Sequence, residues 1–195
     1  MNLAETNFPL LIVRDFLNTN ELENVWKELD DLNKFMTLPD TLSASYKEDG
    51  KIKKNNKACW PVMIYGPNNS TSITLNLYKK IFEKSFIEKA QSLHWFFKYM
   101  SNVTKDAVLI NLYENGDSYK SHNDVCTITS LIWLWREPKA FTGGDMIFDD
   151  TYHFPISNNT LIMFPSCINH EVTEVKMDDK PGHGRYAITL FSHIV

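Results

Sequence analysis

Histidine and aspartate residues at two distant places in this chain have the types and spacing of metal ligands. His122 and Asp124 lie two residues apart, and because a strand alternates its side chains, both project to one side of a strand or of its end. His170 lies far downstream, at the start of another β-rich run. Two imidazoles and one carboxylate form the facial triad that binds non-haem Fe(II) and leaves coordination positions open. The alternative is a surface pair of His122 with Asp124 and an unrelated loop histidine.

An arginine begins the segment Arg185-Tyr-Ala-Ile-Thr-Leu-Phe191, which is typical of a buried strand. A guanidinium that enters a core must be paired, and a bidentate carboxylate is its natural partner. Asp145, Asp149 or Glu171 could supply that carboxylate within the protein. Once the iron site is granted, we favour a bound dicarboxylate instead. Thr189 points the same way as the arginine and could add a hydroxyl to the same pocket.

The elements that must position these residues follow from the pattern of apolar side chains. The pattern predicts a strand at 10–17, a capped helix at 20–34, and a long loop at 37–71 that holds a hairpin at 58–65. Residues 72–100 carry an apolar stripe at helical spacing, which predicts one or two helices that back a sheet. The β-rich runs that follow, separated by turn residues, are typical of an antiparallel sandwich or barrel: 107–113, 118–122, 127–135, 145–148, 160–164, 171–176 and 185–193.

Length, composition and charge predict a single globular domain and argue against several other classes of protein. The chain has 195 residues, of which 43% are hydrophobic, and this predicts one domain with a substantial core. It shows neither a secretion signal nor an apolar run of the ~20 residues that a membrane span needs. Three cysteines give no disulfide framework and favour the cytoplasm. A net charge of -4 argues against nucleic-acid binding, and we expect the basic cluster at 51–57 to be a solvated loop.

Several short motifs occur in a fixed order and together resemble one family. They are Tyr113-x-x-Gly116-x-x-Tyr119-x-x-His122-x-Asp124, Gly143-Gly144-Asp145, Phe164-Pro165-Ser166, His170-Glu-Val172 and Arg185-Tyr-Ala-Ile-Thr189. This series resembles that of the 2-oxoglutarate- and Fe(II)-dependent oxygenases, most closely their prolyl 4-hydroxylase-like branch. The resemblance covers residues 107–193.

The resemblance implies a fold and a domain organisation. The fold is mostly β with amino-terminal helices (α+β), and its core is a double-stranded β-helix, jelly-roll or cupin-like, of two antiparallel sheets. We expect residues 1–195 to form a single dioxygenase domain. Residues 1–106 would supply the amino-terminal strand, helices and long loop, and residues 107–195 the β-helix core.

The resemblance also implies roles for individual residues. His122, Asp124 and His170 would bind Fe(II) at the catalytic centre, and Arg185 would pair with the distal carboxylate of 2-oxoglutarate. Further residues would line the cosubstrate pocket, namely Tyr113, Thr129, Leu131, Val172 and Thr189, and two would flank the iron nearer the substrate, namely Tyr119 and Phe191. O₂ would be the second cosubstrate, and ascorbate is a candidate reductant.

Two departures from the family pattern stand out. Trp133 occupies the position where oxygen-sensing prolyl hydroxylases have a tyrosine that helps to bind the distal carboxylate. An indole N–H donates a hydrogen bond but cannot accept one. The segment between His170 and Arg185 also carries an insertion at 176–184, which we interpret as a longer hairpin turn.

The function implied is hydroxylation of a C–H bond with release of succinate and CO₂. The preferred substrate is a prolyl residue of a protein or peptide, over which the 37–71 loop, with Trp60 and Tyr65, could fold. Free proline or another small amino acid is the alternative substrate and would need a closed pocket. Nucleic-acid demethylation is disfavoured by the acidic balance. An alternative of another class is a non-catalytic β-helix module that binds a ligand or partner. We favour a monomer.

Overall fold

Two long strands, β4 (Lys105–Tyr113) and β13 (Arg185–His193), run through the middle of the larger sheet. They pair antiparallel along their whole length. The computed structural model describes residues 1–39, 53–178 and 180–194, and within them this sheet has the order β1-β2-β10-β6-β13-β4-β3. Its other strands are β1 (Asn2–Leu3), β2 (Leu11–Val13), β3 (Lys57–Cys59), β6 (Ile128–Leu134) and β10 (Thr160–Pro165).

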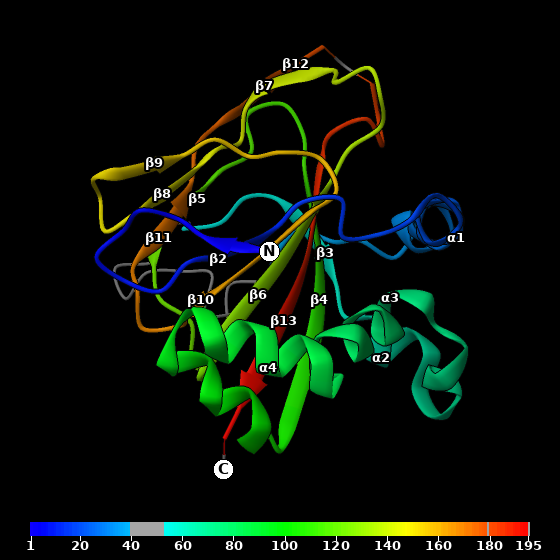
Figure 1. Ribbon diagram of the computed structural model, residues 1–195. Coiled ribbons are helices and arrows are strands. Elements are labelled where there is room, and N and C mark those ends of the chain that lie inside the picture. The colour runs from blue at the N-terminus through cyan, green and yellow to red at the C-terminus, as the bar shows by residue number, and fades with distance from the viewer. Residues whose placement is uncertain (40–52, 179, 195) are drawn as a thin grey trace.

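A smaller sheet faces the first and has the order β5-β11-β8-β9 (Figure 1). Its strands are β5 (Tyr119–His122), β8 (Met146–Phe148), β9 (Tyr152–Phe154) and β11 (His170–Val172). A separate pair joins β7 (Phe141–Gly143) to β12 (Val175–Met177). All these pairings are antiparallel. The two facing sheets form the double-stranded β-helix that the sequence predicted.

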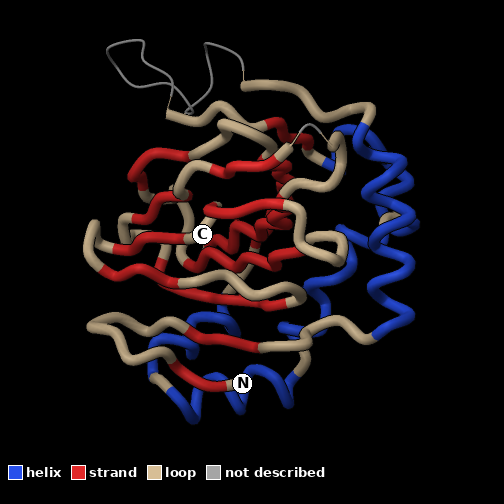
Figure 2. The backbone as a smooth tube through the Cα atoms, turned by 90° about the horizontal axis from the view of Figure 1, so that it is seen from above, coloured by secondary structure: helices blue, strands red, loops and turns tan. Residues whose placement is uncertain are grey.

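Helices lie on the outer side of the larger sheet (Figures 1 and 2). The α-helices are α1 (Thr19–Asn33), α2 (Pro61–Tyr65), α3 (Ile73–Asn76) and α4 (Lys84–Leu93), and the 3₁₀ helices are η1 (Gly66–Thr71), η2 (Leu77–Phe82) and η3 (Trp95–Asn102). Asn18 and Glu21 form a reciprocal capping box that begins α1. Among the described residues, no helix combines the length and the apolarity that a membrane span requires.

Alternation along the strands of the larger sheet produces two apolar cores. One face packs against the helices, where Ile110, Ile132 and Ile188 meet residues such as Leu29 and Phe97. The other face packs against the smaller sheet through a separate cluster, which includes Tyr113, Leu131, Trp133, Met146, Phe148, Phe164, Val172 and Ala187. Because successive side chains point to opposite faces, residues that face the smaller sheet are available for a site between the sheets.

The structure corrects several expectations. The hairpin at 58–65 is wrong, because Pro61 occupies the first turn of α2 and ends the strand character after β3. The run at 171–176 is split into β11 and β12, which belong to different sheets. The insertion at 176–184 is no hairpin turn, since β12 pairs with β7 and not with β13. Residues 40–52 of the predicted loop lie outside the described part of the chain.

Candidate metal centre and carboxylate pocket

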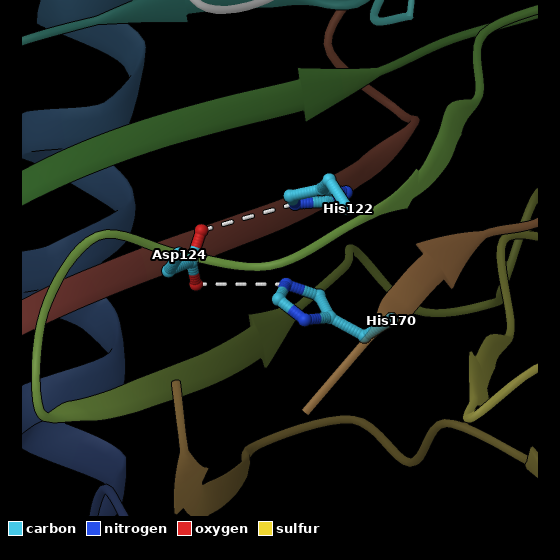
Figure 3. A group of neighbouring side chains, drawn as sticks. All are labelled: His122, Asp124 and His170. Carbon is cyan, nitrogen blue, oxygen red and sulfur yellow. Dashed lines mark ion pairs between the residues drawn. The ribbon is translucent and has the colours of Figure 1, made fainter. Parts of the chain in front are cut away.

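His122 and His170 are cross-strand partners at the end of the smaller sheet, on β5 and β11. Their ring centroids lie 4.2 Å apart. Asp124 follows β5 by two residues and lies between them, with Oδ1 3.8 Å from Nε2 of His122 and Oδ2 3.5 Å from Nε2 of His170 (Figure 3). One ligand atom from each of the three residues lies within 4.8 Å of the others. This arrangement can receive one metal ion.

Backbone carbonyls fix the orientation of both imidazoles. Nδ1 of His122 lies 2.8 Å from the carbonyl oxygen of Lys120, and Nδ1 of His170 lies 3.0 Å from that of Ile168. Each Nδ1 therefore donates, which leaves each Nε2 as the free lone pair on the Asp124 side. A second hydrogen bond of this kind is the usual companion of a metal-binding histidine.

Hydroxyl groups behind Asp124 hold its carboxylate in place. Thr129, which is fully buried, donates from Oγ1 to Oδ2 of Asp124 at 2.6 Å and lies 2.9 Å from Oγ of Ser166. The backbone N–H of Asp124 donates to the carbonyl of Ser166 at 3.0 Å. Cys126 approaches the same Ser166 hydroxyl at 2.8 Å. The carboxylate thus has a preset direction before any ligand binds.

The electrostatic environment keeps His122 neutral. Burial and, less strongly, the neighbouring His170 lower the pKa of His122 to about 3, while the hydrogen bond to Lys120 opposes this shift. A neutral imidazole is the form that coordinates a metal. Nε2 of His122 is therefore a neutral donor beside the carboxylate of Asp124, which fits a divalent cation.

A cavity of about 780 Å³ opens between the sheets and contains this cluster. It extends along the inward faces of β4 and β13 to Arg185, which is 1% exposed. Besides Arg185, six of the residues predicted for the cosubstrate or substrate side line it: Tyr113, Tyr119, Leu131, Val172, Thr189 and Phe191. One cavity thus brings together the metal ligands and most of the predicted pocket.

Arg185 is buried without a counter-ion. Nε and Nη1 of its guanidinium have no hydrogen-bond partner, and among the described residues no ion pair joins it to Asp145, Asp149 or Glu171. Burial lowers its pKa to about 10, against the opposing effects of Tyr113 and Asp145. None of the three carboxylates that the sequence offered thus pairs with Arg185. Because a buried cation needs a partner, we expect a bound anion to pair with it.

Two predicted pocket residues take other positions. Thr129 does not line the cavity and instead donates to Asp124 from behind. Trp133 is fully buried outside the cavity lining, with its ring centroid 5.8 Å from the guanidinium carbon of Arg185 and its Nε1 without a partner. The indole is thus beside the arginine, as its place on β6 suggested, and its one donor is unused.

Sequence reasoning missed two polar residues of the cavity. Asn111 lies two residues before Tyr113 on β4, so the period of two already placed both on one face. Lys54 was expected in a solvated loop, and this expectation is wrong: it is 5% exposed, and its Nζ donates to Oδ1 of Asn111 at 2.6 Å. No local pattern in 51–57 distinguishes this lysine from its neighbours, because its burial comes from contacts with β4 and β5.

The sequence between β4 and β13 matches a known family. The family model described as the 2OG-Fe(II) oxygenase superfamily matches residues 108–193. This segment of the chain is therefore similar to the 2OG-Fe(II) oxygenase superfamily. That segment contains His122, Asp124, His170 and Arg185. A PKHD-type hydroxylase of Shewanella baltica (strain OS185) is 29% identical over 80 residues, which cover 34% of this chain and 36% of that protein.

A PKHD-type hydroxylase of Acinetobacter baumannii (strain AYE) is 30% identical over 82 residues, with the same coverage of both chains. The match therefore spans only 36% of the length of these curated relatives. Solved structures resemble this chain over nearly its full length. A Pseudomonas putida prolyl-4-hydroxylase superposes with a TM-score of 0.65 at 12% identity, covering 97% of this chain and 94% of that one.

A prolyl hydroxylase from Trichoplax adhaerens, in complex with a hypoxia inducible factor oxygen degradation domain peptide fragment, gives a TM-score of 0.64 at 17% identity. The match covers 95% of this chain and 83% of that one. At these identities the likeness shows the fold alone, which is the double-stranded β-helix.

Proposed function

We propose that this protein is a 2-oxoglutarate- and Fe(II)-dependent dioxygenase that hydroxylates a C–H bond and releases succinate and CO₂. One observation carries the proposal: a guanidinium that is 1% exposed, and that has no counter-ion in the described part of the chain, lies in the same cavity as a His-Asp-His cluster. A dicarboxylic 2-oxo acid has the chemistry to satisfy both, with one end for the arginine and the other for the metal.

The three clustered side chains are the proposed metal ligands. His122, Asp124 and His170 would hold Fe(II), since two neutral imidazoles and one carboxylate suit this ion and leave positions open. Bound iron would supply the redox chemistry that activates O₂ and oxidises the substrate. The carbonyls that receive the Nδ1 hydrogens and the hydroxyl of Thr129 keep the three ligand atoms aimed at one point.

The remaining residues of the pocket bind and orient 2-oxoglutarate. Arg185 would receive the distal carboxylate on Nε and Nη1, which have no other partner. Thr189 and the indole N–H of Trp133 are further donors near this end. Leu131 and Val172 line the cavity with apolar side chains, which exclude water and strengthen the ion pair.

The substrate would enter where aromatic residues meet. The rings of Trp60 and Phe191 lie 6.1 Å apart, and Tyr119 stacks on the His122 imidazole at 3.6 Å. Trp60, Leu38 and Val125 line the cavity while remaining exposed, so an apolar rim surrounds it. Such a rim supports a prolyl residue of a protein or peptide as substrate, and the prolyl hydroxylase from Trichoplax adhaerens was solved in complex with a peptide fragment.

We treat residues 1–195 as one dioxygenase domain, because the larger sheet joins strands β1, β2 and β3 from residues 1–106 to strands of the β-helix core. Free proline is the alternative substrate. A requirement for a carboxylate in the substrate would favour this alternative. A non-catalytic binding module is the alternative of another class.

Incubation of the purified protein with Fe(II), 2-oxoglutarate and proline-containing peptides tests the proposal. We expect succinate by chromatography and a product that has gained one oxygen atom by mass spectrometry. Metal analysis that finds one iron per protein, at a site that 2-oxoglutarate perturbs, would exclude the non-catalytic binding module. Full turnover in Asp124→Ala or His170→Ala would refute the metal assignment, and the absence of succinate with every peptide and with free proline would refute the activity.

A further inference from the structure

Lys54 is a second buried cation in the cavity, separate from Arg185. Its side chain lines the cavity, and its residue is 5% exposed. Its Nζ donates to Oδ1 of Asn111 at 2.6 Å and lies 5.4 Å from the centre of the Tyr119 ring. Within the described residues, no carboxylate forms an ion pair with it. Lysine is almost never fully buried unless it is paired, so this position requires an explanation.

Among the described residues, the ammonium group of Lys54 has one hydrogen-bond partner, the side-chain oxygen of Asn111. An ammonium has three donors, and one hydrogen bond to a neutral amide uses one of them. Burial lowers the pKa of Lys54 to about 8, and the charge of Asp124 opposes this. Asp124 is a proposed metal ligand, so a bound divalent cation would offset its charge. With the metal bound, the Lys54 ammonium therefore loses the stabilising charge of Asp124, and an added anion would stabilise it more strongly.

The two cations lie at different places along the cavity. Arg185 is the cross-strand partner of Tyr113, whereas Asn111, which holds Lys54, is the partner of Ala187, one inward-facing position further along the strands. The backbone of Lys54 bridges to Tyr119, whose ring stacks on His122. Lys54 thus lies beside the metal ligands, while Arg185 receives the distal carboxylate of the cosubstrate. One dicarboxylate bound at Arg185 and the metal leaves Lys54 without an anion.

We propose that Nζ of Lys54 binds a carboxylate of the organic substrate, so that the substrate is an anion whose carboxylate lies near the carbon that is hydroxylated. This inference rests on the proposed function and names the substrate class of that site. The α-carboxylate of a free amino acid fits it, as does an acidic side chain beside the target residue of a peptide.

Asn111 and its neighbours position the lysine for this role. Asn56, which is fully buried, donates to Oδ1 of Asn111 at 3.3 Å, and Nδ2 of Asn111 donates to Oγ1 of Thr189 at 3.3 Å. The amide of Asn111 is therefore fixed on both sides and presents its oxygen to Lys54. Through Thr189 this chain of hydrogen bonds reaches the proposed cosubstrate pocket, so the two anion sites lie next to each other without sharing a donor.

Acetate, the smallest stable probe of a carboxylate site, tests the proposal. The protein is loaded with Zn²⁺ as a redox-inert metal and saturated with 2-oxoglutarate, and acetate is titrated at constant ionic strength. NMR of the Asn111 side-chain amide and of the lysine Nζ reports binding. We expect saturable shifts in the unaltered protein and in Lys53→Met, whose lysine also lines the cavity, and a loss of acetate affinity of about 10-fold or more in Lys54→Met.

Three results would overturn the proposal. One is the absence of saturable acetate binding, and another is unchanged binding in Lys54→Met. The third is that Lys54→Met lowers the affinity for 2-oxoglutarate and that 2-oxoglutarate displaces acetate. Lys54 would then bind a carboxylate of the cosubstrate and not one of the substrate. Lys54→Arg keeps the charge and should restore acetate binding if the fold of Lys54→Met is disturbed. Calorimetry of 2-oxoglutarate with the zinc-loaded protein reports failure of the proposed function separately.

Discussion

Arg185 and Tyr113 face each other across β13 and β4, with the guanidinium carbon 4.9 Å from the centre of the phenol ring. Trp133 covers the same guanidinium from β6, so aromatic rings surround a charge that has no counter-ion among the described residues. Aromatic faces attract a cation but do not replace a carboxylate. Gly144 completes this enclosure, because a Cβ there would lie 2.9 Å from Cδ of Arg185. The pocket is therefore formed before the anion arrives.

Replacing Arg185 should separate binding from folding. Arg185→Met removes a buried cation that lacks an ion pair, so we expect an equal or higher melting temperature without ligand. The affinity for 2-oxoglutarate should fall about 100-fold, since two charge-assisted hydrogen bonds are lost. Calorimetry and thermal unfolding measure both. Arg14→Met, which removes an arginine that donates to Ser157 on the surface, should change neither. An unchanged affinity in Arg185→Met would show that Arg185 does not bind the distal carboxylate.

The hydroxyl of Thr129 should control metal affinity through Asp124. Thr129→Val keeps the shape of the side chain but removes the donor to Oδ2 of Asp124, and loss of such an outer hydrogen bond weakens metal binding about 10- to 100-fold. Titration with Co(II) followed by absorbance gives the affinity. Thr129→Ser should restore it. Thr160→Val, which removes another buried hydroxyl, is the control, and equal losses in both valine variants would assign the effect to packing.

The unused indole donor of Trp133 should contribute to 2-oxoglutarate binding. Trp133→Phe removes Nε1 and leaves an aromatic ring beside the guanidinium. One hydrogen bond is worth about 1 kcal/mol, so we expect the affinity for 2-oxoglutarate to fall about 5-fold. Calorimetry on the zinc-loaded protein measures this. Trp135→Phe, whose indole donates to Glu137 outside the cavity, provides the matched comparison, and a similar fall there would remove the case for a direct bond.

The charge of Lys54 should appear in the pH dependence of stability. Its pKa is lowered from 10.5 to about 8 by burial, with Asp124 opposing; Tyr119 and His122 also face it. Below about pH 8 both folded and unfolded states carry the proton, so the folded state bears the whole cost of the buried charge. Above it the folded state loses the proton first, the unfolded state binds more protons, and stability rises with pH.

Lys54→Met should therefore be more stable than the unaltered protein near neutral pH, by on the order of 3 kcal/mol. This advantage should shrink as the pH rises from about 8 toward 10.5. Urea unfolding at a series of pH values gives the difference directly, and Lys53→Met should show no such trend. A constant difference across this window would mean that Lys54 titrates normally.

Matched substrates should distinguish a carboxylate requirement from a general preference for proline. L-proline is compared with L-prolinamide, and peptides with glutamate beside proline are compared with peptides that have glutamine there. We expect the carboxylate member of each pair to give kcat/KM about 10-fold higher or more, and Lys54→Met to remove the difference. Equal rates within each pair would show that the enzyme ignores the charge.

The β-rich runs and turn residues predicted an antiparallel sandwich or barrel, and the resemblance of the ordered motifs implied the double-stranded β-helix, whose two sheets the structure shows. His122 and Asp124 share a side because a strand alternates its side chains, and the encounter with His170 follows once β5 and β11 pair. Lys54 was not predictable, since its burial depends on contacts with Asn111 and Tyr119, which are far from it in the sequence. Thr129 was assigned to the pocket by the resemblance, which does not give the direction of its hydroxyl, and in the structure that hydroxyl donates to Asp124.

The metal cluster belongs to the smaller sheet and the arginine to the larger one, and the aromatic and aliphatic side chains packed between the sheets, such as Phe148 and Phe164, hold the two apart. The distance between the proposed metal site and Arg185 is then set by that packing and not by either motif. The core between the sheets therefore determines the length of the dicarboxylate that can reach both. Trimming Phe148 or Phe164 should alter which chain length is accepted, although neither residue lines the cavity.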